Sequence, residues 1–197
     1  MLDYLKKLPI DLGQGNLRFT TKGKLIALSF VKNGYGKTAL DVGCREGVQT
    51  KWLKDKGYEV KSVDIKKVFK NCIIVDLNEK LPFNDKSFDL IWCSEVLEHL
   101  DNPVFIKTEF RRVLKPKGEM ILTTPNSYSW IFLFGLLATK MQRKDHKQFF
   151  SMKDIKKLFP NAEIYGYFPY VAEYRYKISK WVGVLSPTFI IRHKENV

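Results

Sequence analysis

Hydrophobic and polar positions divide the chain from Thr38 onward into two kinds of segment. Short apolar runs of strand length alternate with longer segments in which apolar residues recur at helical spacing. The pattern predicts strands over 38–42, 59–64, 72–76, 88–93 and 119–124, and further strands near 162–168 and 187–193. It predicts helices over 17–31, 48–56 and 103–114, a turn over 115–118, and a helix that begins at Ser151, with Asp154 completing a capping box.

This alternation is typical of one α/β domain over residues 1–197. A strand followed by a helix and then another strand indicates a parallel sheet with right-handed crossovers. The composition, 45% hydrophobic and 28% charged residues, fits a globular protein and excludes a disordered or collagen-like chain.

Three scattered cysteines, without a CxxC motif, predict neither a disulfide framework nor a metal site, and they suit a reducing compartment. The N-terminus has no continuous apolar stretch of the kind found in signal peptides. The longest uncharged apolar run, 130–138, is nine residues long, whereas a membrane span needs about 20. We therefore expect a soluble, cytoplasmic protein.

The net charge of +13 is concentrated towards the two ends of the chain. Such an excess can attract nucleic acid or an anionic membrane surface through the basic flanks, which would give weak contacts. Lysine far outnumbers arginine among the basic residues, and lysine suits a solvated surface better than bidentate recognition of bases or phosphates.

The first predicted strand ends in the segment Asp41–Gly47, and parallel sheets bind ligands at the carboxyl ends of their strands. A phosphate-binding P-loop is excluded because Val31 stands where its first glycine belongs, and because the strand follows the motif. A dinucleotide-binding turn is disfavoured because Arg45 and Val48 occupy two of its three glycine positions.

S-adenosylmethionine fits the pattern better, because aspartates close three successive strands. Asp41 could accept a hydrogen bond from the ammonium group of the cofactor, Asp64 from both ribose hydroxyls, and Asp76 from the adenine amine. Aspartate is also a common helix cap and turn former, so each of the three also has a structural interpretation.

Four motifs, ALDVGCREG, SVDI, VDLNEKLPFNDKSFDLIWCSEVLEHL and EFRRVLKPKGEMILTTPN, span about residues 38–126. Together they resemble the class I S-adenosylmethionine-dependent methyltransferases, and most of all the branch with the ubiquinone and menaquinone methyltransferases. The resemblance implies a Rossmann-like seven-stranded sheet, six strands parallel and the last antiparallel, with helices on both faces. It implies S-adenosylmethionine as cofactor, S-adenosylhomocysteine as product, and cofactor contacts at Asp41, Gly43, Cys44, Arg45, Gly47, Asp64, Ile65, Asp76, Leu77 and Ser94.

The same resemblance divides the domain into functional parts. Residues 1–37 form an N-terminal helical segment, 38–126 the cofactor-binding core, 127–160 the cover of the substrate and 161–197 the C-terminal strands. Arg45 departs from the family, which usually has glycine there. Its side chain could crowd the cofactor, turn to solvent, or pair with the carboxylate of the methionine moiety.

Methyl transfer needs an acceptor lone pair held in line with the sulfonium, and oxygen acceptors often need a base as well. The candidates for catalysis are Glu95, His99 and His146. The segment Ser94–His99 should border the acceptor, although Glu98 and His99 belong to a motif that also fits a structural role. His146 could equally be a capping or packing histidine.

Two segments have more than one interpretation, so the sequence does not determine the chemical class of the methyl acceptor. The hydrophobic segment 129–140 could cover the acceptor or lie on a membrane surface, and its apolar residues on all sides favour burial. The aromatic and basic stretch 165–181 could bind nucleic acid or form a buried edge of the sheet. We expect a methyltransferase for a small or lipid-like acceptor. The alternatives are an RNA or protein methyltransferase and a non-catalytic module that binds the cofactor.

Overall fold

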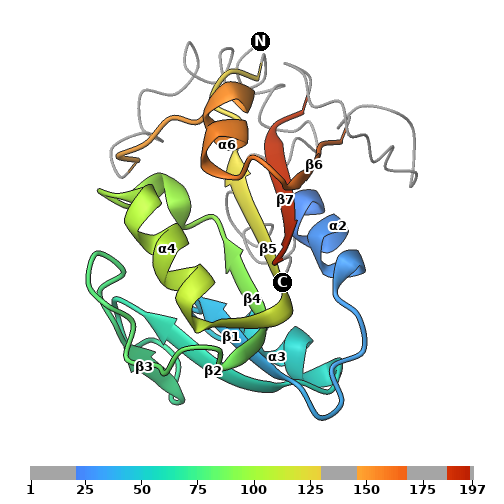
Figure 1. Ribbon diagram of the computed structural model, residues 1–197, viewed down its shortest axis with the longest axis vertical. Helices are drawn as coiled ribbons and strands as arrows, with labels where there is room; N and C mark the ends of the chain where they lie inside the picture. Colours follow the sequence, from blue (N-terminus) through green and yellow to red (C-terminus); the bar gives the residue numbers. More distant parts are fainter. Residues whose placement is uncertain (1–20, 130–145, 168–185, 196–197) are drawn as a thin grey trace, which may run out of the picture.

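The computed structural model describes residues 21–129, 146–167 and 186–195. Within them, seven strands form one sheet in the order β3-β2-β1-β4-β5-β7-β6 (Figure 1). The strands are β1 (Thr38–Val42), β2 (Glu59–Asp64), β3 (Cys72–Ile74), β4 (Phe88–Ser94), β5 (Leu114–Pro125), β6 (Glu163–Tyr165) and β7 (Thr188–Lys194). The helices are α2 (Lys22–Phe30), α3 (Val48–Asp55), α4 (Pro103–Val113) and α6 (Met152–Leu158), together with a short 3-10 turn, η2 (Leu97–His99).

The direction of the strands confirms the predicted sheet. β1 pairs in parallel with β2 on one side and with β4 on the other, and β3 and β5 continue the parallel pairing outwards. β7 is antiparallel to both of its neighbours, β5 and β6. The strand order reverses between β1 and β4, and in open α/β sheets this reversal marks the ligand crevice at the carboxyl ends of the strands.

Successive side chains of each strand point to opposite faces of the sheet, and both faces are buried. Leu40 and Val42 of β1 belong to the apolar cluster that includes residues of α4 and α6. Ala39, between them, belongs to a second cluster that includes residues of α2 and α3. Helices therefore cover both faces, as predicted (Figure 1).

The helix ends follow the capping residues in the sequence. The Asn102 side chain accepts a hydrogen bond from the backbone of Phe105 at the start of α4, and Pro103 occupies the first turn. Ser151 and Asp154 form the predicted capping box of α6. The Thr21 side chain caps α2, so the described part of the predicted helix 17–31 begins at Lys22.

The prediction of a turn over 115–118 is wrong, because these residues belong to β5. Leu114 pairs with Phe88 of β4, and the register then shifts before Leu90 pairs with Glu119. Lys117 has a φ of 65°. The Lys-Pro-Lys-Gly sequence therefore forms an irregularity inside a long strand, and the chain continues along β4 instead of turning away.

Strand β3 is also shorter than predicted, since it ends at Ile74 and not at Asp76. The predicted hydrophobic segment 129–140 lies outside the described residues except for Ser129, and so does most of the stretch 165–181. Among the helices that the structure describes, none is long and apolar enough to cross a membrane.

Candidate functional site

The carboxyl ends of β1, β2 and β4 meet at one edge of the sheet. Val42, the last residue of β1, pairs with Val63 of β2 and with Cys93 of β4. The glycine turn Gly43–Gly47 therefore leaves β1 between the ends of its two neighbours. Backbone bonds fix its start, because the amides of Gly43 and Cys44 both donate to the carbonyl oxygen of Val63, over 2.8 and 3.1 Å.

The two glycines of this turn have no room for a side chain. Gly43 has a φ of 76°, and a Cβ atom there would lie 2.3 Å from Cγ2 of Val96. Gly47 has a φ of 81°, and a Cβ atom would lie 2.8 Å from the ring of Phe69. Glycine alone adopts such angles without a steric cost, so the turn keeps its backbone close to the edge of the sheet.

Asp64 holds the turn against the end of β2. Its Oδ2 atom accepts a hydrogen bond of 2.9 Å from the backbone amide of Arg45, and its Oδ1 atom accepts one of 3.1 Å from the amide of Lys66. Each carboxylate oxygen can accept two hydrogen bonds. The carboxylate is therefore oriented by the backbone and keeps the capacity to accept from a ligand.

Asp41 is a buried acid that is linked to two hydroxyl groups, those of Thr50 and Ser62, by successive hydrogen bonds. Its side chain is 1% exposed and accepts a hydrogen bond of 2.5 Å from Thr50 of α3. Thr50 has one hydroxyl proton, so Ser62 donates in its own 2.8 Å contact with Thr50. Burial raises the pKa of Asp41 to about 7, although the Thr50 hydrogen bond opposes the shift, and the nearby charge of Asp64 adds to it.

The other predicted cofactor residues lie around this edge with different exposures. Asp76 is exposed, and its Oδ1 atom accepts hydrogen bonds from the backbone amide and the side chain of Asn78, over 2.9 and 3.0 Å. Cys44 and Leu77 are buried, whereas Ile65 is 63% exposed. Asp76 thus forms a turn through one oxygen, Oδ1, and its contact with the adenine amine stays a prediction.

A second network of hydrogen-bonded side chains lies at the ends of β4 and β5. Thr123 of β5 donates a hydrogen bond of 2.7 Å to Oε1 of Glu95 and lies 2.8 Å from the hydroxyl of Ser94. Because the Thr123 proton is used, Ser94 donates in that contact. Glu95 has a φ of 55°, so the chain bends sharply at the residue that follows β4.

Glu98 is the most deeply buried carboxyl group on this side of the site. Its side chain is 3% exposed, and its Oε2 atom accepts a hydrogen bond of 3.0 Å from Thr124 of β5. Burial raises the pKa of Glu98 well above its ordinary value, and the charge of Glu95 adds to this shift. Two of the acids in the predicted segment Ser94–His99 therefore act on each other.

The two predicted histidines lie against Glu98, although they are far apart in the sequence. The rings of His99 and His146 meet edge to face, with centroids 5.0 Å apart. Nε2 of His99 lies 3.9 Å from Oε1 of Glu98. The structure therefore places His99 and His146 together beside Glu98, whereas Glu95 accepts from Thr123.

Sequence reasoning missed the hydroxyl groups that orient these acids: Thr50, Ser62, Thr123 and Thr124. A weak signal for the last two was present, since two threonines end an otherwise apolar strand, EMILTT. Thr50 gave no comparable signal, because its role depends on how α3 lies beside β1 and β2.

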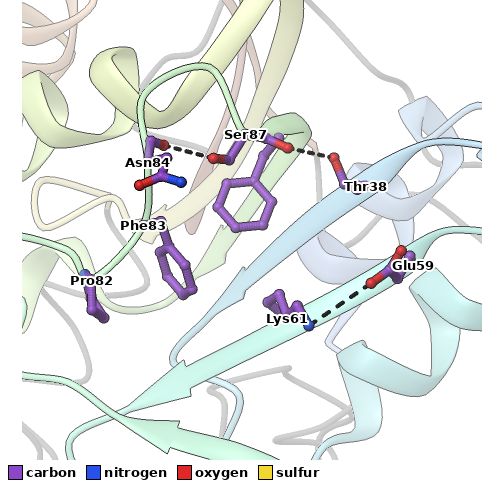
Figure 2. A pocket seen from close by; sticks show the side chains of 8 residues that line it. Thr38, Glu59, Lys61, Pro82, Phe83, Asn84 and Ser87 are labelled. Carbon is purple, nitrogen blue, oxygen red and sulfur yellow. Dashed lines mark hydrogen bonds and ion pairs between the residues drawn. The ribbon is translucent and has the colours of Figure 1, made fainter.

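A pocket of about 260 Å³ lies at the opposite edge of the sheet (Figure 2). It is lined by the first residues of three strands, Thr38, Glu59 and Phe88, and by the loop that includes Pro82 and Phe83. Because ligands of open parallel sheets bind at the carboxyl ends, this pocket is not the candidate site.

Comparisons with known proteins agree with the geometry. The family model of the methyltransferase domain matches residues 40–122. The ubiquinone biosynthesis O-methyltransferase of Idiomarina loihiensis is 28% identical over 136 residues, 58% of this chain and 55% of the relative. The enzyme of that name from Dechloromonas aromatica is 28% identical over 122 residues, 53% of this chain and 51% of the relative. The chain thus spans about half the length of these relatives.

Solved structures share the fold. An S-adenosylmethionine-dependent methyltransferase from Thermotoga maritima, described as a possible histamine N-methyltransferase, superposes with a TM-score of 0.71 at 16% identity, over 90% of this chain and 89% of its own. An S-adenosylmethionine-dependent methyltransferase from Mesorhizobium loti gives 0.69 at 14% identity, over 90% and 100% of the two chains. At such identities the likeness concerns the fold.

Proposed function

We propose that the chain transfers a methyl group from S-adenosylmethionine to a small or lipid-like acceptor, because residues 40–122 match the family model of the methyltransferase domain. The cofactor, when bound, supplies a methyl group on a sulfonium that leaves as a neutral thioether. The residues of this chain bind it, orient the acceptor and exclude water, and such positioning can lower the barrier by up to about 7–11 kcal/mol.

One observation carries the proposal. The turn Gly43–Gly47 lies between Asp41, which is buried, and Asp64, whose carboxylate is held at the edge of the site. Gly43 and Gly47 give the turn its left-handed bends, and Val96 and Phe69 pack against them. The buried Asp41 carboxyl offers an acceptor for an ammonium group, and Asp64, held by two backbone amides, offers acceptors for ribose hydroxyls. An amino acid joined to a nucleoside has these groups, so the residues present fit the cofactor.

The acceptor side of the proposal rests on different support. The relatives are named for O-methylation in ubiquinone biosynthesis, which favours an oxygen acceptor on a small or lipid-like molecule. Glu95, Glu98 and His99 lie beyond the end of β4, next to the glycine turn through Val96. The substrate cover at 127–160 and the cytoplasmic location remain predictions.

Arg45 departs from the family pattern, but its main chain supports the proposed site. The residue is exposed, and its backbone amide donates a hydrogen bond to Asp64. Arg45 therefore contributes to the proposed cofactor site through its main chain. Of the three alternatives that the sequence left open for this side chain, the exposed position agrees with a side chain turned to solvent.

Calorimetry with S-adenosylmethionine and S-adenosylhomocysteine tests cofactor binding directly. We expect both to bind the wild type, and Asp64→Asn to weaken binding by about 1–3 kcal/mol, the cost of an unmade hydrogen bond at a charged acceptor. Asp55→Asn is the matched control, because Asp55 is an exposed acid of α3 paired with Lys51. Two results would contradict the proposed cofactor site at the glycine turn and Asp64. One is no heat of binding with the wild type, and the other is an equal loss of affinity in both variants.

The acceptor class is tested by incubating the protein and labelled cofactor with separated fractions of a cell extract. We expect label in the small-molecule or lipid fraction. Binding to RNA should be weak and should fall steeply as salt rises. Salt-resistant binding to a defined RNA, with label incorporated into it, would favour the RNA methyltransferase instead.

A further inference from the structure

Three potential metal ligands converge beside the proposed acceptor position. One ligand atom each of Glu98, His99 and His146 lies within 4.8 Å of the other two. Glu98 is buried, His146 is half-buried and His99 is exposed, so the cluster extends from the interior of the site to its surface. Two imidazoles and one carboxylate are the ligands of many catalytic zinc and non-haem iron sites.

Main-chain hydrogen bonds bring His146 to the other two residues. The amides of Lys147 and Gln148 both donate to the carbonyl oxygen of Glu98, over 2.8 and 2.9 Å. The Gln148 side chain donates to the carbonyl of Leu100 at 3.2 Å, and Lys147 pairs with Asp101 at 2.7 Å. The segment that follows His146 is thereby fastened to the segment that carries Glu98 and His99.

Glu98 is oriented as metal-binding carboxylates usually are. Thr124 donates to one oxygen, Oε2, while the other, Oε1, lies 3.9 Å from Nε2 of His99. A hydrogen bond on one carboxylate oxygen directs the second oxygen and is a common supporting contact in metal sites. Ligands bound at about 2.0–2.2 Å lie about 3.4 Å apart in a tetrahedral site. The three atoms would have to move together by about an ångström, which the exposed His99 side chain allows.

We propose that Glu98, His99 and His146 bind a divalent first-row metal ion such as Zn²⁺, with an open position towards the methyl acceptor. The cysteine count gave no reason to expect a metal, but it does not bear on a site made of histidine and glutamate. The binding site stands on this geometry alone. Its role rests on the proposed function: a bound ion would hold an acceptor hydroxyl and favour its ionised form.

The nature of the ligands also excludes the harder cations as the preferred occupant. Mg²⁺ takes oxygen ligands in near-octahedral geometry and keeps several waters, whereas two of the three ligands here are imidazoles. We therefore expect that Co²⁺, a spectroscopic substitute for Zn²⁺, binds and that excess Mg²⁺ does not displace it.

The test is Co²⁺ titration of the full chain after removal of metals with a chelator, followed by visible absorption and equilibrium dialysis. We expect one Co²⁺ ion to bind per chain, with the visible absorption of Co²⁺ coordinated by imidazoles. Added Zn²⁺ should displace this ion. His99→Ala and His146→Ala should each lower the affinity at least as much as the loss of a supporting contact does, about 10–100-fold. Thr124→Val, which removes only the hydrogen bond to Glu98, should lower it within that range.

His193→Asn is the matched control, because His193 is the third histidine of the chain and pairs with Glu195 outside the cluster. It should leave the affinity unchanged. Absence of Co²⁺ binding by the wild type, equal losses in all three histidine variants, or displacement by Mg²⁺ would overturn the proposal. Circular dichroism of each variant separates loss of a ligand from loss of the fold. Calorimetry with S-adenosylmethionine in chelator tests the proposed function separately.

Discussion

Asp41 and Asp64 both stand at the ends of neighbouring strands, yet their carboxyl groups have different surroundings. Asp64 accepts from two backbone amides at the edge of the site. Asp41 is buried and accepts from a threonine hydroxyl. Burial disfavours the charged form of a carboxyl group. The protonation of Asp41 should therefore change with pH near neutrality, as its raised pKa indicates.

Asp41 makes the stability of the protein depend on pH. Its pKa in the folded state, about 7, lies above the ordinary value of 3.8 for an aspartate, so the folded state binds more protons than the unfolded state between these values. The stabilisation is complete below pH 4 and is lost as pH rises through about 7. From this group the free energy of unfolding should fall by up to about 1.4 kcal/mol per pH unit.

Urea unfolding of the wild type and of Asp41→Asn at pH 5, 6, 7 and 8 measures this contribution. The difference between the two proteins should change over this range and level off above pH 7. Lys24, whose charge opposes the shift, and Asp64, whose charge adds to it, are present in both proteins. A difference independent of pH would contradict the raised pKa.

Arg45 offers a second test at the glycine turn. Its φ of 45° lies in the left-handed region that costs a non-glycine residue about 1–2 kcal/mol. Arg45→Gly removes this cost but makes the unfolded chain more flexible, so we expect a gain in stability of no more than about 1 kcal/mol. Because Arg45 is exposed, cofactor affinity should be nearly unchanged.

Thermal unfolding and calorimetry check this prediction, with Lys86→Gly, at a φ of 52° in another loop, as the control for backbone strain. A tenfold loss of cofactor affinity in Arg45→Gly would indicate that the guanidinium binds the cofactor. A tenfold gain would indicate that the side chain crowds it.

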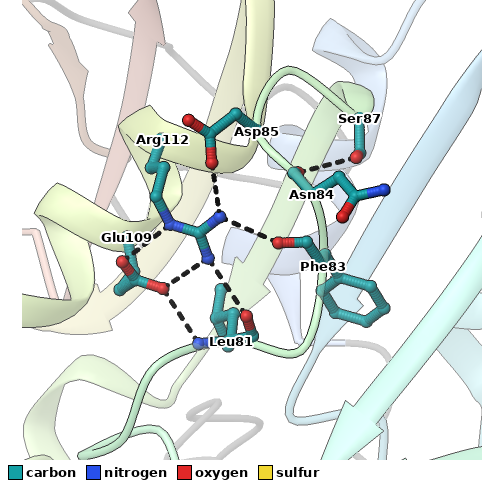
Figure 3. Close-up of polar contacts among 7 residues, drawn as sticks. All are labelled: Leu81, Phe83, Asn84, Asp85, Ser87, Glu109 and Arg112. Carbon is teal, nitrogen blue, oxygen red and sulfur yellow. Dashed lines mark hydrogen bonds and ion pairs between the residues drawn. The ribbon is translucent and has the colours of Figure 1, made fainter.

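Helix α4 and the loop before β4 are fastened by one arginine (Figure 3). The Arg112 guanidinium donates to the carbonyls of Leu81 and Phe83, to Asp85 and to both oxygens of Glu109. Glu109 in turn accepts from the amide of Leu81 at 2.9 Å. This network fixes the loop that leads into β4, and β4 carries the acceptor side of the site.

Arg112→Ala should lower the free energy of unfolding by about 3–5 kcal/mol, because it leaves the buried Glu109 carboxylate without its cation. Arg111→Ala is the matched control, since the neighbouring Arg111 pairs with Glu195 at a more exposed position, where such pairs are worth about 0–1 kcal/mol. Chemical unfolding of both variants gives the comparison. Equal effects would show that the network does not fasten the loop.

The elements show what the sequence could predict. β1 and β2 have the predicted bounds. β1 is the buried apolar run that the pattern indicates, whereas β2 is buried only at Ser62 and Val63. The turn at 115–118 was wrong because Lys-Pro-Lys-Gly is typical of turns, while pairing of Leu114 with Phe88 keeps the chain extended. The local preference for a turn was therefore overridden by strand pairing between residues far apart in the sequence.

The candidate site shows the same division. The positions of Asp41 and Asp64 followed from the ends of predicted strands. Their partners Thr50 and Arg45 did not, since these depend on the bend of the turn and the placement of α3. The contact of His146 with His99 depends on main-chain bonds that no local pattern encodes.

The molecule as a whole depends on β7, which connects β6 to the rest of the sheet. Ile191 of β7 is fully buried, pairs with Leu122 of β5 and Ile164 of β6, and belongs to the cluster with α4 and α6. Ile191→Ala should therefore cost about 2–5 kcal/mol in the free energy of unfolding. Ile74→Ala, at an edge residue that is 62% exposed, should cost far less, and chemical unfolding of both variants decides the matter.

The place of β7 also has a consequence for how the protein is made. β5 ends at Pro125 and its partner β7 begins at Thr188, and a ribosome adds about 5–20 residues per second. One side of β5 therefore has no strand beside it for several seconds after β5 has been synthesised. An apolar strand with an open edge is a site for pairing with other chains. The nascent protein should accordingly depend on chaperones most in the interval before its last strand is complete.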